Sequence, residues 1–126
     1  MTVATSNARA AYGRREGPVH SNRSHEYDLL ARCTQHLAMA WNSRKTDFPS
    51  LAMALTENLQ LWSALAADVA GSGNGLPAPL RAQLFYLYEF TASHTSAVLD
   101  HRGSVEVLVD INTAVMRGLR GDGGGA

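Results

Sequence analysis

The spacing of the apolar residues constrains the fold of this chain more than any other feature. In four separate segments, apolar side chains recur at intervals of three and four residues, which places them on one face of an α-helix. None of these segments shows the apolar and polar alternation of a half-buried strand. We therefore predict an all-α fold, a small helical bundle of about four main helices with a short N-terminal arm.

Capping and turn-forming residues delimit the first two predicted helices. Ser24 is a suitable N-cap for a helix that runs to about Ser43. Asp47 is a suitable N-cap for the second helix, and Pro49 in its first turn loses no hydrogen bond that it would otherwise make. Gly71 is expected to end this second helix.

The second half of the chain is divided in the same way. Pro77 and Pro79 favour the start of a third helix, because each fixes a backbone angle that suits a first turn, and this helix is expected to reach about His101. Gly103 then interrupts the chain, and Ser104 can cap a fourth helix.

Composition divides the chain into three parts. Residues 1–23 are predicted to be an arm and linker, because they are rich in Gly, Pro, Ser, Asn and charge from position 13 onward. Residues 24–120 are predicted to form the helical bundle domain, which is long enough for one self-sufficient core. Residues 121–126 are a Gly-rich segment that we expect to be a flexible tail.

The charge balance argues against several classes of partner. Eleven Lys and Arg residues are offset by eleven Asp and Glu residues, and no basic block is present, so direct binding of nucleic acid is not expected. No run approaches the roughly 20 apolar residues of a membrane-spanning helix. The single cysteine, Cys33, allows no disulfide framework. We predict a soluble cytoplasmic protein.

The stretch FTASHTSAVLDH, residues 90–101, carries hydroxyls and an imidazole on an otherwise apolar helix. Nucleophilic catalysis by His94 and a hydroxyl would require a third group that orients the imidazole and donors for an oxyanion, and the sequence suggests neither. The hydroxyls of Thr91 and Thr95 can instead bond backbone carbonyls of the preceding turn. We predict that His94 is buried and hydrogen-bonded, with partner contact and a phosphoacceptor role as alternatives, and we expect no enzymatic activity.

No metal or cofactor site is predicted. His94 and His101 are two turns apart, and the remaining three histidines are scattered, so no pair has the one-turn spacing of a helical metal site.

Asparagines and aromatic residues beside the apolar stripes indicate either core structure or a binding surface. Asn58 and Asn112 must find hydrogen-bond partners, which fixes helix register or serves a partner. The third helix is apolar on both sides, so it is either central to the bundle or exposes a groove for a partner helix. We predict that seven residues contribute to a partner-binding surface: Asn58, Trp62, Leu84, Tyr88, Thr91, His94 and Asn112.

Several short stretches have the order and spacing of a known family. They are AAYGR at 10–14, TDFPSLAMAL at 46–55, NLQLWSALAADVA at 58–70, GNGLPAPLRAQL at 73–84, SHTSAVL at 93–99 and DINTAVMRGL at 110–119. Together they span residues 10–119, and on them the chain resembles the flagellar biosynthesis regulator FlaF family. The family pattern has basic residues after Asn58, where this chain has Leu59 and Gln60, so no charge-based contact is inferred there.

The resemblance implies a non-enzymatic, chaperone-like cytoplasmic protein that binds flagellin and supports its synthesis and secretion. It also implies that the protein works alongside the RNA-binding regulator FlbT, and it implies no cofactor. Two alternatives stay open: a translational regulator that acts on flagellin mRNA directly or with FlbT, and a histidine phosphotransfer domain. No oligomeric state is predicted.

Overall fold

The computed structural model describes residues 18–71 and 75–120 of the chain, and these residues form four α-helices without a strand. The predicted all-α bundle is therefore confirmed. None of the described helices combines the length and the apolarity that crossing a bilayer requires. The helices are α2 (Pro18–Asn42), α3 (Phe48–Ala70), α4 (Ala78–Leu99) and α5 (Glu106–Arg120).

Two of the predicted caps form as expected. Asp47 Oδ1 accepts a hydrogen bond from the backbone N–H of Ser50 at 3.2 Å, and Asp47 Oδ2 accepts one from the Ser50 hydroxyl at 2.6 Å. Ser104 Oγ accepts the N–H of Glu106 at 3.2 Å. Each cap satisfies a donor that the first helical turn leaves without an intrahelical partner.

The first helix differs from its predicted bounds. α2 begins at Pro18, so Ser24 lies inside the helix and is not its N-cap. Proline is favoured in the first turn of a helix, and the six residues from 18 to 23 include no glycine or later proline that would interrupt it. The predicted boundary at residue 24 therefore falls within a continuous helix. The rest of the predicted arm, residues 1–17, and the predicted tail, residues 121–126, lie outside the described residues.

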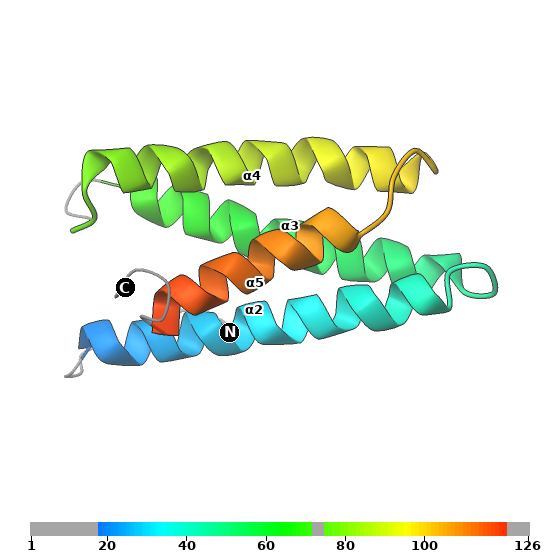
Figure 1. Cartoon of the computed structure of the whole chain (residues 1–126), viewed down its shortest axis with the longest axis horizontal. Helices are drawn as coiled ribbons and strands as arrows, with labels where there is room; N and C mark the ends of the chain where they lie inside the picture. The colour runs from blue at the N-terminus through cyan, green and yellow to red at the C-terminus, as the bar shows by residue number, and fades with distance from the viewer. Residues whose placement is uncertain (1–17, 72–74, 121–126) are drawn as a thin grey trace.

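The packing order leaves α4 at one side of the bundle. α2 packs against both α3 and α5, and α3 packs in addition against α4, whereas α4 and α5 share few contacts (Figure 1). α5 runs obliquely from the α4–α5 loop toward the first half of α2, so it diverges from α4 along its length. The interpretation of the third helix as central to the bundle is therefore wrong.

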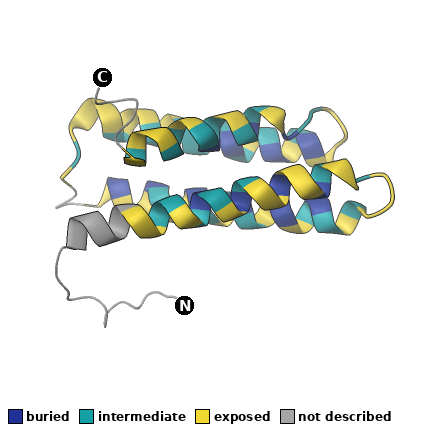
Figure 2. Cartoon of the chain, turned by 60° about the horizontal axis from the view of Figure 1, so that its bottom comes forward, coloured by how far each residue is buried: buried dark blue, intermediate teal, exposed yellow. Residues whose placement is uncertain are grey.

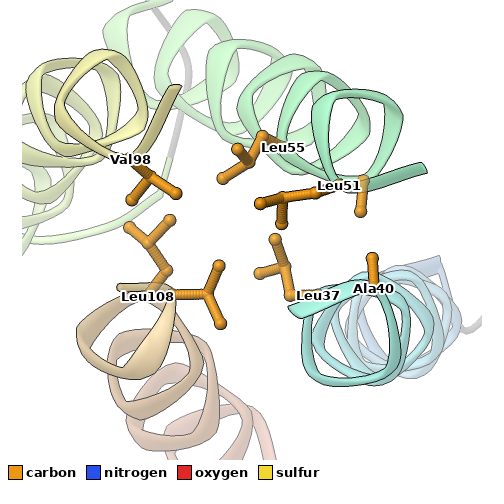
Figure 3. Packing of buried hydrophobic residues seen from close by; sticks show 8 residues of the cluster. Leu37, Ala40, Leu51, Leu55, Val98 and Leu108 are labelled. Atoms are coloured by element: carbon orange, nitrogen blue, oxygen red, sulfur yellow. The ribbon is translucent and has the colours of Figure 1, made fainter. Parts of the chain in front are cut away.

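A compact apolar cluster joins all four helices near the end that holds the α2–α3 turn and the α4–α5 loop (Figures 2 and 3). Full burial of a side chain such as leucine or valine stabilises a fold by about 1.5–3 kcal/mol. The cluster consists of Leu37, Ala40, Leu51, Ala54, Leu55, Val98, Val105 and Leu108.

The thiol of Cys33 is buried in α2, with 3% of the residue exposed. Burial, reinforced by the negative charge of Glu57, raises the pKa of the Cys33 thiol from 9.0 to about 12. Three pKa units reduce the thiolate fraction at pH 8 about 1,000-fold, and the thiolate is the reactive form.

We expect dithiobis(nitrobenzoate) to modify the native protein at least about 100-fold more slowly than the denatured protein. Because Cys33 is the single cysteine, the absorbance signal reports it alone. Similar rates in the two states would contradict its burial.

Candidate partner-binding surface

Three polar groups form a hydrogen-bonded link between α3 and α5. The indole Nε1–H of Trp62 donates to Asn112 Oδ1 at 2.9 Å, and Asn112 Nδ2 donates to Asn58 Oδ1 at 2.8 Å. Trp62 and Asn58 are 0% exposed and Asn112 is 1% exposed. Such bonds are stronger in the low-dielectric interior than in water, so the link ties α5 to α3 through the core.

This link changes the interpretation of three predicted surface residues. Asn58, Trp62 and Asn112 were expected to contact a partner, but a partner cannot reach side chains that the bundle covers completely. Their polar atoms bond one another because the stripes of α3 and α5 both point inward. The positions of the two asparagines therefore match the other interpretation, in which buried amides fix the register of packed helices.

His94 holds the α4–α5 loop. Its Nε2 lies 2.7 Å from the carbonyl oxygen of Ser104, and since a carbonyl only accepts, Nε2 carries the hydrogen and donates it. The ring also stacks on Phe90, with centroids 5.6 Å apart. A Cβ placed on Gly103 would lie 3.1 Å from His94 Cε1, so a side chain there would require the ring to shift by a few tenths of an ångström. The predicted hydrogen bond is present, although His94 is half-buried and not fully buried.

The two threonines beside His94 differ from each other. Thr95 Oγ1 donates to the backbone carbonyl of Thr91 at 2.7 Å, as predicted. Thr91 is 0% exposed, and within the described part of the chain its hydroxyl has no hydrogen-bond partner. The expectation that Thr91 bonds the preceding turn or contacts a partner is therefore corrected. An unpaired buried hydroxyl costs about 1–3 kcal/mol.

The inner face of α4 becomes more exposed to solvent toward the N-terminus of the helix. Val98 and Thr91 on this face are buried, whereas Leu84, Leu87 and Tyr88 are half-buried and Leu80 is 42% exposed. The change follows the divergence of α5, which approaches α4 only near their connecting loop (Figure 1). We call Leu80, Leu84, Leu87 and Tyr88 the open seam. Leu84 and Tyr88 are thus the two predicted site residues that remain accessible on this apolar face.

The inner face of α5 also becomes more exposed to solvent, toward the C-terminus of the helix. Leu108 and Asn112 are buried, but Val115 and Leu119, which continue the same face, are half-buried. Spacing by three and four residues puts Leu80 and Leu87 in the apolar stripe of α4, and Val115 and Leu119 in that of α5, but it assigns none of them to a binding surface. Their spacing identified the inner face, and only the divergence of the helices shows where that face is accessible.

The outer side of α4 is also apolar. Phe85 is 42% exposed and Tyr86 is 63% exposed, and the ring of Phe85 lies 5.8 Å from that of Tyr88. Large apolar side chains are also exposed on α2 and α3, at Met39 and Met53, so exposure alone does not single out the outer side of α4 as a binding surface. In residues 18–71 and 75–120, no three His, Cys, Asp or Glu side chains are grouped so as to hold a metal ion.

The comparison with protein families links the chain to one cellular system, the flagellum. A model of the family described as flagellar protein FlaF matches residues 8–119. The chain belongs to the FlaF family of flagellar proteins. The match includes α2, α3, α4 and all but the last residue of α5, so the open seam is part of the FlaF region. Neither the comparison with curated proteins nor that with solved structures finds a match.

Proposed function

We propose that this FlaF-family protein binds flagellin in the cytoplasm and supports its synthesis and secretion without catalysing a reaction. The observation that supports the proposal most directly is the open seam, an apolar continuation of the bundle interior that is half-buried or exposed and that has little contact with α5. Membership of a flagellar family makes a flagellar protein the natural occupant.

An amphipathic helix of flagellin fits this surface chemically. Its apolar residues, spaced by three and four, would pack on Leu84 and Leu87 as a further helix packs on a bundle. A stable complex of this kind buries about 1,200–2,000 Å² in total. If the flagellin segment folds as it binds, the ordering cost lowers the net affinity, which suits a complex that must release its cargo for secretion.

Zero net charge supports recognition through apolar contacts rather than through phosphates. Any contact with flagellin mRNA would then belong to a partner such as FlbT. His94 is not proposed as a phosphoacceptor, because its Nε2 is already bonded to the Ser104 carbonyl.

The proposal predicts a specific loss of flagellin binding from the open seam. We expect the double variant Leu80→Ser and Leu87→Ser to bind monomeric flagellin at least about 30-fold more weakly by calorimetry, since two leucine anchors contribute about 1–2 kcal/mol each. Leu80 is already 42% exposed and Leu87 half-buried, so the bundle should remain folded, which circular dichroism verifies.

Tyr86→Ser is the matched control, because it removes an apolar side chain from the outer side of the same helix, where Tyr86 is 63% exposed. Its affinity for flagellin should equal that of the wild type. Undiminished binding by the double variant, or an equal loss in the control, would argue against the open seam. Binding of the flagellin messenger that falls steeply with salt would instead favour the translational alternative.

A further inference from the structure

A cavity lies at the C-terminal end of α4, opposite the end that carries the open seam. It has a volume of about 600 Å³ and is formed by the end of α2, the start of α3 and the α4–α5 loop. Its apolar walls include Trp41, Phe48 and Val98. This volume is within the range of pockets that hold a small ligand or a few side chains of a peptide. We call it the end pocket.

Two cationic side chains line the end pocket. The guanidinium of Arg44 lies over the Trp41 ring, 3.7 Å from its centroid, and Arg44 Nη1 donates to the Trp41 carbonyl at 2.9 Å. These contacts hold Arg44 in place and leave its other N–H groups for a ligand, since a guanidinium has five. Lys45, the next residue, adds a second positive charge.

Among the described residues that line the end pocket, none is a carboxylate. The acidic residues next to it in the sequence are engaged elsewhere. Asp47 accepts both bonds from Ser50 at the start of α3. Asp100 pairs with Arg102 at 3.3 Å. The charge that faces the pocket is therefore positive.

His101 is placed in the pocket wall by an unusual backbone conformation. α4 ends in a Schellman arrangement, in which the N–H of His101 bonds the Val98 carbonyl at 3.0 Å and the N–H of Arg102 bonds the Ala97 carbonyl at 2.8 Å. The residue at this position adopts a left-handed conformation, here with φ of 62°, and glycine is the residue that adopts it without strain. With histidine there, an imidazole packs on Phe48 at 5.1 Å between centroids and lines the pocket.

We propose that the end pocket binds a carboxylate of an acidic peptide segment in a partner protein. Arg44, Lys45 and His101 supply donors for the carboxylate, and Trp41 and Phe48 pack on an apolar side chain next to it. A phosphate-bearing polymer would require a longer basic surface than two cations provide. The end pocket is remote from the open seam along α4, so this inference does not depend on the flagellin proposal.

The test compares two blocked peptides that differ only in charge. Acetyl-Leu-Phe-Asp-Leu-amide and its isosteric Asn counterpart are titrated into the full-length ¹⁵N-labelled protein at low ionic strength and followed by NMR. The Asp peptide should shift the amide signals of residues 41–48 and 101–103. It should bind at least about 10-fold more tightly than the Asn peptide, because charge-assisted bonds are about twice as strong as neutral ones.

Two pocket variants and one control variant separate binding from folding. Lys45→Gln should lower the affinity for the Asp peptide about 10-fold. Arg32→Gln is the control, because it removes the same charge from an exposed site on α2 outside the pocket, and it should leave this affinity unchanged. His101→Gly should also weaken binding while leaving the melting temperature unchanged or raised, because glycine tolerates the left-handed conformation.

Three results would overturn the proposal. The first is equal affinity for the Asp and Asn peptides. The second is the absence of signal changes around the end pocket at millimolar Asp peptide. The third is an equal response to inorganic phosphate, which would assign the pocket to phosphate-bearing ligands.

Discussion

Trp62→Ala is expected to lower the free energy of unfolding by about 4–5 kcal/mol. Truncating a buried tryptophan leaves a cavity that costs about 3–5 kcal/mol, and Trp62 is 0% exposed. The change also removes the Nε1–H donor that Asn112 Oδ1 accepts at 2.9 Å, so a buried amide oxygen is left unpaired. Domains of this size are stable by only about 5–15 kcal/mol, so urea denaturation should show a strongly destabilised variant.

Trp62→Phe separates the two contributions to this loss. Phenylalanine keeps much of the aromatic volume but has no N–H, so we expect a smaller loss of about 1–3 kcal/mol, mainly from the unpaired Asn112 oxygen. Tyr86→Ala serves as the control, because this aromatic is 63% exposed and its loss should cost less than about 1 kcal/mol. Equal costs for Trp62→Ala and Tyr86→Ala would contradict the buried position of Trp62.

Much of this fold could be predicted because its signals are local. The stripe in α3 predicts a buried face, and Leu51, Leu55 and Trp62 are all 0% exposed. Asp47 and Ser104 were identified as caps from residue type alone, since a cap requires an acceptor at one position beside a helical segment. The start of α2 was missed because Ser24 is a good cap residue in a segment where helix formation simply continues.

The candidate site was less predictable because it depends on how helices sit relative to one another. Spacing places Leu80 and Val98 on the same face of α4, yet one is 42% exposed and the other 1% exposed. No residue in α4 encodes this difference, which arises from the direction of α5. In the same way, tryptophan is a residue type that often anchors a binding partner, and only the position of Asn112 shows that the Trp62 N–H donates its hydrogen bond inside the core.

The polar link in the core and the open seam are connected through α5. Asn112 bonds Trp62 and Asn58, both in α3, and α5 also packs along α2, so α5 is held on the α2–α3 side of the bundle. A shift of α5 toward α4 would cover the open seam. Buried amides oppose such a shift, because it would leave their polar groups unpaired. The link therefore favours the arrangement in which α4 remains available to a partner.

Asn112→Ala is accordingly expected to cost about 3–4 kcal/mol, more than Asn58→Ala. The first change leaves two buried groups without partners, the Nε1–H of Trp62 and Oδ1 of Asn58, at about 1–3 kcal/mol each. Asn58→Ala leaves one such group, the Nδ2 of Asn112, and it also removes the Asn58 Nδ2 that has no partner within the described chain. Urea denaturation of both variants gives the comparison directly.

A double-mutant cycle of Trp62→Phe with Asn112→Ala tests whether these residues act as one unit. Asn112→Ala destabilises the fold in part because it leaves the Trp62 N–H unpaired, and this N–H is absent once Trp62 is phenylalanine. The double variant should therefore lose about 1–3 kcal/mol less free energy of unfolding than the two single variants lose together. Additive losses, or equal costs for the two asparagines, would contradict the link between α3 and α5. Under the proposed function, the same Asn112→Ala variant should also bind flagellin more weakly than its residual stability explains, because α5 loses the hydrogen bonds that hold it on α3 and away from the open seam.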